Sequence, residues 1–156
     1  MLRIKHIVQE GNELDIVREL FREYEKEWNE NICFQSFDEE LKDPLKKYGP
    51  PSGDLVLAYW EDDVAGCIAL TKMKDKTACE MKRLYVRPEF RKNKIGRILI
   101  EELMTSAKEK NYEKMRLDTF FKLGAAIHLY DQFGFKNISP YYNNPLPGVV
   151  YMEKEL

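Results

Sequence analysis

The sequence predicts a mixed α/β (α+β) fold in which helices cover one central sheet. Three β-rich runs follow one another between residues 54 and 86 with only short polar breaks, which indicates an antiparallel meander. Helical stripes lie before and after this meander, and single strands alternate with helices in the second half. Together these observations predict a mostly antiparallel sheet of about seven strands flanked by about four helices. The length suits a single domain over residues 1–156.

The first third of the chain is expected to form one strand and two helices. The run "RIKHIV" (3–8) alternates as a strand does. Apolar residues then recur at steps of three and four, on one face of a helix capped by Asn12: Leu14, Val17, Phe21, Tyr24 and Trp28. A short helix is expected from residues 36–38 to Pro44, because the residue before a proline avoids helical angles. Prolines and glycines predict a loop over residues 47–54.

The remaining elements follow from periodicity and from turn residues. The meander consists of residues 54–60, 64–73 and 79–86. A helix over 95–110 has a regular apolar stripe, and a strand follows at 114–119. The next helix runs through Ala126 and Phe133, and Gly134 is expected to end it in a left-handed conformation. The last strands, at 135–142 and 149–156, are joined by the proline-rich segment 143–148.

Composition argues against several classes of protein. A net charge of −2 provides no global positive field to attract nucleic acid. No stretch approaches the roughly 20 apolar residues of a membrane span, and the N-terminus lacks the apolar core of a signal peptide. Cys33, Cys67 and Cys79 form no CxxC pair, which favours reduced thiols and a cytoplasmic protein. His6 and His128 are too scattered for a metal site.

Positive charge gathers where the helix over 95–110 begins. Arg91, Lys92, Lys94 and Arg97 lie within seven residues, although the dipole of a helix repels cations at this end. The first N–H groups of a helix have no partner within it and form a ready site for phosphate oxygens. The cluster therefore predicts a small anionic ligand; the alternative is a solvated basic helix start.

These residues resemble the GNAT family of acyl-CoA-dependent N-acetyltransferases. The family's signature (Arg or Gln, two residues, Gly, one residue, then Gly or Ala) corresponds to Arg91–Gly96, with Lys94 at the first glycine. The late-helix motif is "LYDQFGF" (129–135); the asparagine that often precedes it is replaced near Leu123. The element order also matches. The segments "CFQ", "YGPPSGD", "CEMKRLYV" and "PYYNNPLPG" are similar to a bacterial subgroup whose substrates are largely unassigned.

The resemblance implies a GNAT-like fold with splayed fourth and fifth strands, and acetyl-CoA as co-substrate. The coenzyme's pyrophosphate would bind at the helix start. The backbone of the fourth strand would hold the pantetheine arm and the oxyanion. The implied cofactor-binding residues are Leu84, Tyr85, Val86, Arg91, Lys92, Asn93, Lys94, Ile95, Gly96 and Arg97.

The chemistry requires a base, because an alkyl amine with a pKa near about 10.4 is protonated at neutral pH. Glu80 is the first candidate, since a glutamate at this spacing before the signature is the base in the family's histone-acetylating branch. Period-two alternation is expected to place it on one face with Lys82, Leu84 and Val86. Asp118 and a chain of waters remain alternatives. Tyr130 resembles the family's general acid, although it also belongs to an apolar helical stripe.

The acceptor, a primary amine of a small molecule or peptide, is expected to contact Phe34, Gln35, Tyr141 and Tyr142. No cysteine has the context of an activated nucleophile, which favours direct transfer in a ternary complex. A non-catalytic acyl-CoA-binding or sensor protein with a degenerate site is the main alternative. The partners expected are thus acetyl-CoA and an amine, with no nucleic acid and no membrane; a homodimer is possible.

Overall fold

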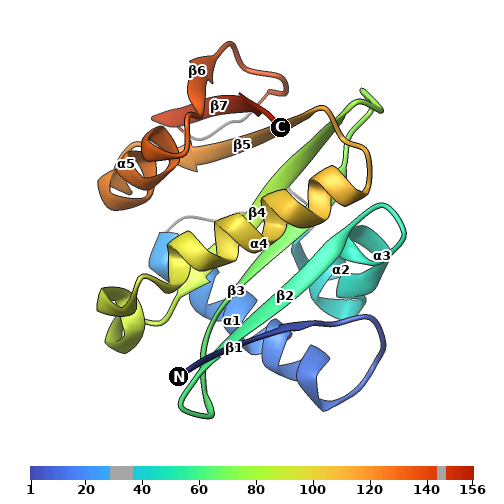
Figure 1. Cartoon of the computed structure of the whole chain (residues 1–156), viewed down its shortest axis with the longest axis vertical. Helices are drawn as coiled ribbons and strands as arrows, with labels where there is room; N and C mark the ends of the chain where they lie inside the picture. The colour runs from blue at the N-terminus through green and yellow to red at the C-terminus, as the bar shows by residue number, and fades with distance from the viewer. Residues whose placement is uncertain (29–36, 144–146) are drawn as a thin grey trace.

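The computed structural model describes residues 1–28, 37–143 and 147–156. Its strands form one seven-stranded sheet in the order β1-β2-β3-β4-β5-β7-β6 (Figure 1). The strands are β1 (Leu2–His6), β2 (Asp54–Trp60), β3 (Asp63–Lys72), β4 (Ala78–Val86), β5 (Lys114–Phe120), β6 (Lys136–Ile138) and β7 (Val149–Glu155). Neighbouring strands are antiparallel except β4 and β5, which are parallel. The predicted mixed, mostly antiparallel sheet is therefore confirmed.

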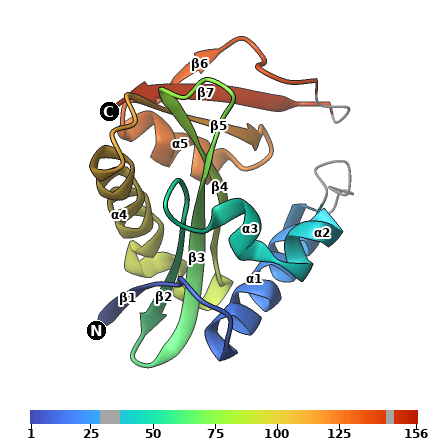
Figure 2. The same cartoon turned by 90° about the vertical axis from the view of Figure 1, so that its right-hand side faces the viewer.

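Helices cover both faces of this sheet. Figures 1 and 2 show α4 (Ile95–Glu109) and α5 (Gly124–Gln132) on one face, and α1 (Asn12–Trp28), α2 (Phe37–Lys42) and α3 (Pro44–Tyr48) on the other. The short 3-10 helix η2 (Pro88–Asn93) connects β4 to α4. Each face has its own apolar core, one beneath α4 and α5 and one beneath α1 to α3. No helix in the described part of the chain has the length and apolar character needed to span a bilayer.

The parallel pair β4 and β5 is joined over only a short distance. Its paired residues are Ala78–Glu80 on β4 and Lys114–Arg116 on β5. Beyond them the two strands no longer pair with each other, although each keeps its other neighbour, and they splay apart (Figure 1). The sheet is therefore open between the second halves of β4 and β5.

A β-bulge interrupts β4 at this opening. Cys67 of β3 pairs with Tyr85 and Ala69 pairs with Lys82, so that Ile68 lies opposite two residues, Arg83 and Leu84. Arg83 has a φ of 60°, in the left-handed region. A bulge disrupts the ladder locally and reverses the alternation of side chains beyond it. The expected common face of Glu80, Lys82, Leu84 and Val86 is therefore wrong.

Core contacts show this reversal directly. Before the bulge, Cys79 and Met81 lie in the core beneath α4; after it, Leu84 and Val86 pack against that core. Glu80 and Lys82, which alternate with Cys79 and Met81, therefore face α1 to α3.

Two other expectations differ from the structure. The helix α2 ends at Lys42, shortly before Pro44, as expected, but Pro44 then begins a further short helix, α3, because proline's fixed φ suits the first helical position. The predicted loop accordingly begins at Gly49. The predicted strand at 135–142 is paired only over Lys136–Ile138. Gly134 ends α5 with a φ of 92°, as predicted.

Candidate active site

A basic groove lies between the start of α4 and α5. It has a volume of about 720 Å³ and is bordered by the end of β4, by η2 and by the α5 helix. Among the described residues that line it, four are cationic and one is acidic: Arg91, Lys94, Arg97 and Lys122, and Glu27 of α1. This part of the surface is positive although the chain as a whole carries a net charge of −2.

Lys94 is the turn residue between η2 and α4. Its φ of 59° lies in the left-handed region, which a glycine adopts without steric cost and which other residues adopt less readily. No side chain caps the first turn of α4. A Cβ on Gly96 would meet the side chains of Leu129 at 3.5 Å and Val86 at 3.9 Å, both ordinary contacts. Packing within the protein therefore does not require a glycine at position 96.

The two groove arginines have protein partners. Arg91 donates from Nε to the carbonyl oxygen of Val86 at 2.8 Å, and its guanidinium pairs with Glu27. Arg97 donates from Nη2 to Gln132 Oε1 at 2.6 Å. Both guanidinium groups remain partly exposed in the groove, so these contacts orient them without burying them.

Most of the predicted cofactor-binding residues lie on this groove. Its lining includes Leu84, Tyr85, Val86, Arg91, Lys94, Gly96 and Arg97. Lys92 and Asn93 belong to η2 but are not among the lining residues. The side chain of Ile95 is fully buried in the core beneath α4, so only its backbone is left to contact a ligand. Lys122, Leu123, Ala126 and Leu129 complete the wall formed by α5 and the turn before it.

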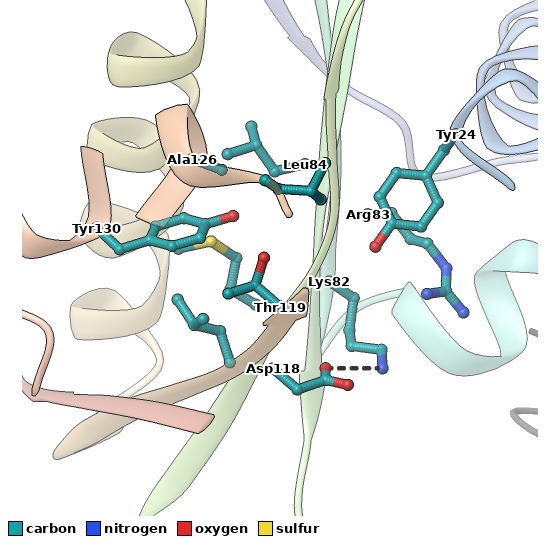
Figure 3. A pocket seen from close by; sticks show the side chains of 11 residues that line it. Tyr24, Lys82, Arg83, Leu84, Asp118, Thr119, Ala126 and Tyr130 are labelled. Carbon is teal, nitrogen blue, oxygen red and sulfur yellow. Dashed lines mark ion pairs between the residues drawn. The ribbon is translucent and has the colours of Figure 1, made fainter. Parts of the chain in front are cut away.

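A small recess of about 40 Å³ adjoins the groove at the splay of β4 and β5. Leu84, Leu123 and Ala126 line both spaces, which makes the recess a continuation of the groove. Figure 3 shows Tyr130 of α5 and Tyr24 of α1 on opposite sides of β4 at this place. The recess is thus lined from both faces of the sheet.

Tyr130 is 6% exposed, and its ring packs against Phe135 with centroids 5.9 Å apart. Burial raises the pKa of its phenol well above the usual range, so the phenol stays protonated. Burial also raises the pKa of Tyr24, although the positive charge of the Arg83 guanidinium lowers it in part. Both phenols can therefore donate a hydrogen bond into the recess at neutral pH.

Carboxylates and tyrosines form a cluster on the side of the splay opposite the groove. The Tyr141 hydroxyl donates to Glu80 Oε2 at 2.7 Å, and the Tyr142 hydroxyl donates to Asp118 Oδ2. Lys82 Nζ lies 3.6 Å from Asp118 Oδ1 and 4.0 Å from Glu80 Oε2. Figure 3 shows the Lys82–Asp118 ion pair below the recess, where it links the two diverging strands. The structure thus brings Glu80, Asp118, Tyr141 and Tyr142 together.

A buried ion pair supports the bulge from beneath. Arg83 donates from Nε to Glu40 Oε2 at 2.7 Å and from Nη2 to Glu40 Oε1 at 3.0 Å. The Tyr48 hydroxyl donates to the same carboxylate at 2.8 Å. Burial opposes ionisation of Glu40, but the guanidinium prevails and holds its pKa below the usual value. The guanidinium carbon also lies 5.5 Å from the centroid of the Tyr24 ring, which connects this pair to the recess.

Several residues of the site were not identified from the sequence. Phe34 and Gln35 lie outside the described residues. The sequence pattern places Tyr24 in the apolar stripe of its helix and Lys82 beside Glu80. No motif in the sequence singles out Thr119 or Glu27. The sequence does hold one indication for Thr119: it follows Asp118 at the end of a strand. Side chains at the end of a splayed strand border the opening between the strands.

The fold and this site together define the class of protein. A sequence model described as the Acetyltransferase (GNAT) family matches residues 14–135, and the chain belongs to this family. An uncharacterised N-acetyltransferase of Schizosaccharomyces pombe is 44% identical over 145 residues, which cover 92% of this chain and 89% of that protein. An uncharacterised N-acetyltransferase of Dictyostelium discoideum is 32% identical over 199 residues, covering 89% and 92%.

Solved structures share the fold. The crystal structure of the PaiA N-acetyltransferase from Thermoplasma acidophilum, in complex with coenzyme A, superposes with a TM-score of 0.73 at 20% identity. The match covers 100% of this chain and 99% of that one. The expectation of a bacterial subgroup is not supported, because the two relatives above come from eukaryotes.

Proposed function

We propose that the protein transfers an acetyl group from acetyl-CoA to a primary amine, directly and within a ternary complex. One observation carries this proposal. A groove with four cationic lining residues leads to a recess at the splay, and the recess connects with a cluster of carboxylates on the other face of the sheet. A donor and an acceptor can therefore approach the same point from opposite faces.

In this arrangement the coenzyme lies along the basic groove. Its diphosphate binds the first N–H groups of α4, with Arg91, Lys94 and Arg97 around it. The pantetheine arm follows β4 from Val86 to Leu84, and the thioester reaches the recess. The PaiA N-acetyltransferase of Thermoplasma acidophilum, which has the same fold, was crystallised in complex with coenzyme A, and this supports coenzyme A as the ligand.

The amine arrives from the face that carries Glu80 and Asp118. Glu80 receives the proton of the ammonium group, through Tyr141 or directly, and the free amine attacks the thioester carbon. Tyr141 and Tyr142 border the acceptor. Tyr130 returns a proton to the departing thiolate; a thiol with a pKa near about 8.5 holds that proton at neutral pH.

Direct transfer is supported by the state of the cysteines. Cys67 is fully buried, and burial raises the pKa of its thiol above the usual range. Burial raises the pKa of Cys79 to about 12. A nucleophilic cysteine has a lowered pKa, so neither thiol is suited to form an acyl-enzyme. Cys33 lies outside the described residues.

The proposal is tested by combining acetyl-CoA binding with a thiol-release assay. The acceptor panel consists of amino acids, polyamines, aminoglycosides and peptide N-termini. We expect at least one amine to release coenzyme A, and the double variant Arg91→Glu, Arg97→Glu to bind acetyl-CoA at least about tenfold more weakly because charge repulsion replaces attraction. Lys108→Glu, Lys110→Glu, at the other end of α4, is the matched control.

The two readouts separate the competing functions. Equal affinity of the wild type and the groove double variant for acetyl-CoA would remove the phosphate assignment. Tight binding without thiol release by any amine would leave a non-catalytic acyl-CoA-binding protein. With an amine that the wild type acetylates, the activity of Glu80→Gln relative to the wild type should be lowest at low pH, where more of the amine is protonated.

A further inference from the structure

We propose that Thr119 is a catalytic residue whose hydroxyl donates a hydrogen bond to the thioester carbonyl oxygen and to the oxyanion that forms from it. This inference rests on the proposed function, since it places the thioester in the recess. Thr119 lies on β5, and its side chain lines the recess together with Tyr130.

The buried hydroxyl of Thr119 has no hydrogen-bond partner in the part of the chain that the structure describes. The residue is 3% exposed, and within residues 1–28, 37–143 and 147–156 its Oγ1 makes no hydrogen bond. The Tyr130 hydroxyl has no partner in the same part of the chain either. Nearly all buried polar side-chain atoms in proteins have a partner, so two such hydroxyls in one recess indicate that a ligand supplies it.

Side chains alternate between the two faces of β5, and the face that Thr119 occupies determines whether its hydroxyl can contact the thioester or the amine. Met115 and Leu117 belong to the core beneath α4, and Phe120 belongs to the core on the opposite face. Thr119 therefore faces the side of the groove, as Leu117 does, and Asp118 faces the carboxylate cluster. Figure 3 shows the oxygens of Thr119 and Tyr130 pointing into the space between α5 and β4. Thr119 is thus placed to contact the thioester and not the amine.

The strand itself does not require a hydroxyl at this position. Thr119 pairs with Val150 of β7 in the ladder, and a β-branched side chain suits such a position. Valine has the same branched shape and would bury no unpaired polar atom. Formation of the strand therefore does not explain why position 119 carries a hydroxyl group.

The chemical step uses the hydroxyl as the second donor of an oxyanion hole. The amine nitrogen forms a bond to the carbonyl carbon, and the electron pair of the C=O bond moves to oxygen. The backbone at the β4 bulge on one arm of the splay and Thr119 on the other then donate to this oxygen. When the C=O bond reforms, the C–S bond breaks and the thiolate takes its proton from Tyr130, and the second proton that the nitrogen loses on becoming an amide restores the phenol. Two fixed donors stabilise the negative charge as it develops.

The test compares Thr119→Val with Thr119→Ser, which keeps a hydroxyl. Infrared difference spectra of bound acetyl-CoA, isotope-labelled at the thioester carbonyl, report directly on a hydrogen bond to that oxygen. We expect the carbonyl band to move to higher frequency in Thr119→Val and to stay near the wild-type position in Thr119→Ser. With an amine from the acceptor panel, kcat should fall about 100-fold in Thr119→Val while Kd for coenzyme A is unchanged.

Stability measurements distinguish this role from a structural one. Thr119→Val should unfold at the same urea concentration as the wild type or a higher one, because no protein hydrogen bond is lost. Thr71→Val is the comparison, since the Thr71 hydroxyl donates to the carbonyl oxygen of Lys47 at 3.1 Å and its loss should lower the urea concentration at which the protein unfolds.

Three outcomes would contradict the role of Thr119, and they differ in what they imply for the proposed function. An unchanged carbonyl band and an unchanged kcat in Thr119→Val would overturn the role of Thr119 and leave the proposed function standing. Loss of stability in Thr119→Val comparable to that in Thr71→Val would assign the hydroxyl a structural role instead. Failure of the wild-type protein to bind acetyl-CoA would overturn both proposals.

Discussion

At the scale of single residues, Arg91 illustrates how a neighbour changes a predicted role. Its place in the signature predicts a partner for the diphosphate, and its side chain does lie on the groove. In the structure, however, the guanidinium already pairs with the carboxylate of Glu27 at the end of α1. An incoming diphosphate and this carboxylate compete for the same cation, so Glu27 is expected to oppose binding of the coenzyme.

Replacement of Glu27 by glutamine should therefore tighten acetyl-CoA binding. An exposed ion pair contributes at most about 1 kcal/mol, which limits the gain to about fivefold. Calorimetry on both proteins at low salt gives the comparison, and the gain should shrink as salt is added. Glu19→Gln is the matched control, because Glu19 also lies on α1 and pairs with an arginine, Arg87, but does not line the groove. Weaker binding by Glu27→Gln would mean that the ion pair orients Arg91 for the coenzyme.

At the scale of an element, the bulge in β4 depends on the buried pair of Arg83 and Glu40. Their side chains are only 2% and 1% exposed, and Arg83 holds the left-handed backbone conformation of the bulge. Taking two charges out of water is unfavourable unless each satisfies the other, as the two hydrogen bonds of this pair do. The shape of the strand at the recess is thus coupled to α2 on the far side of the core.

Removal of one member of this pair should be far more damaging than removal of both. Arg83→Met leaves the Glu40 carboxylate buried without its guanidinium, and we expect it to lower the free energy of unfolding by about 3–5 kcal/mol. The double variant Arg83→Met, Glu40→Leu should recover much of this loss, because no charge then remains buried. Urea denaturation of the wild type, both single variants and the double variant measures the coupling. Additive losses would show that the two residues contribute independently.

At the scale of the whole molecule, a polar cluster joins the N-terminal strand to α4. His6 of β1 contacts Asp54 of β2 through Nδ1 at 2.8 Å and Glu102 of α4 through Nε2 at 2.7 Å. Ser106 donates to the same Asp54 at 2.6 Å. Burial disfavours the charged imidazole, but hydrogen bonds to the two carboxylates outweigh it and raise the pKa of His6 above 6.5.

This cluster should make stability depend on pH in a defined direction. Because the pKa of His6 is raised in the folded state, its stabilisation is complete below pH 6.5 and is lost as pH rises through the folded-state pKa. The unfolding free energy of the wild type minus that of His6→Gln should therefore be larger at pH 6 than at pH 8.5, by less than about 1 kcal/mol because His6 is partly exposed. His128→Gln, at the exposed surface of α5, is the control. A difference that grows with pH would contradict the assignment.

Local patterns predicted most of the fold. The apolar stripe of α4, the meander of β2 to β4 and the left-handed stop at Gly134 depend on residues close together in sequence, and each is present. The helix end before Pro44 is also present, but α3 was missed, because the same restriction of φ lets a proline end one helix and begin another. The extent of β6 depends on pairing with β7, which no local signal defines.

The sequence by itself determined the order of the elements, apart from the short helix α3, and the basic helix start whose backbone donors suit an anion, since both follow from short-range periodicity and charge. Only the tertiary structure decided which face Glu80 occupies, that Glu27 competes for Arg91, and that Thr119 and Tyr130 share one recess. These features depend on strand register, on the bulge at Arg83 and on contacts between residues far apart in the chain. A single extra residue in β4 reverses every side chain beyond it, and periodicity alone does not reveal that residue.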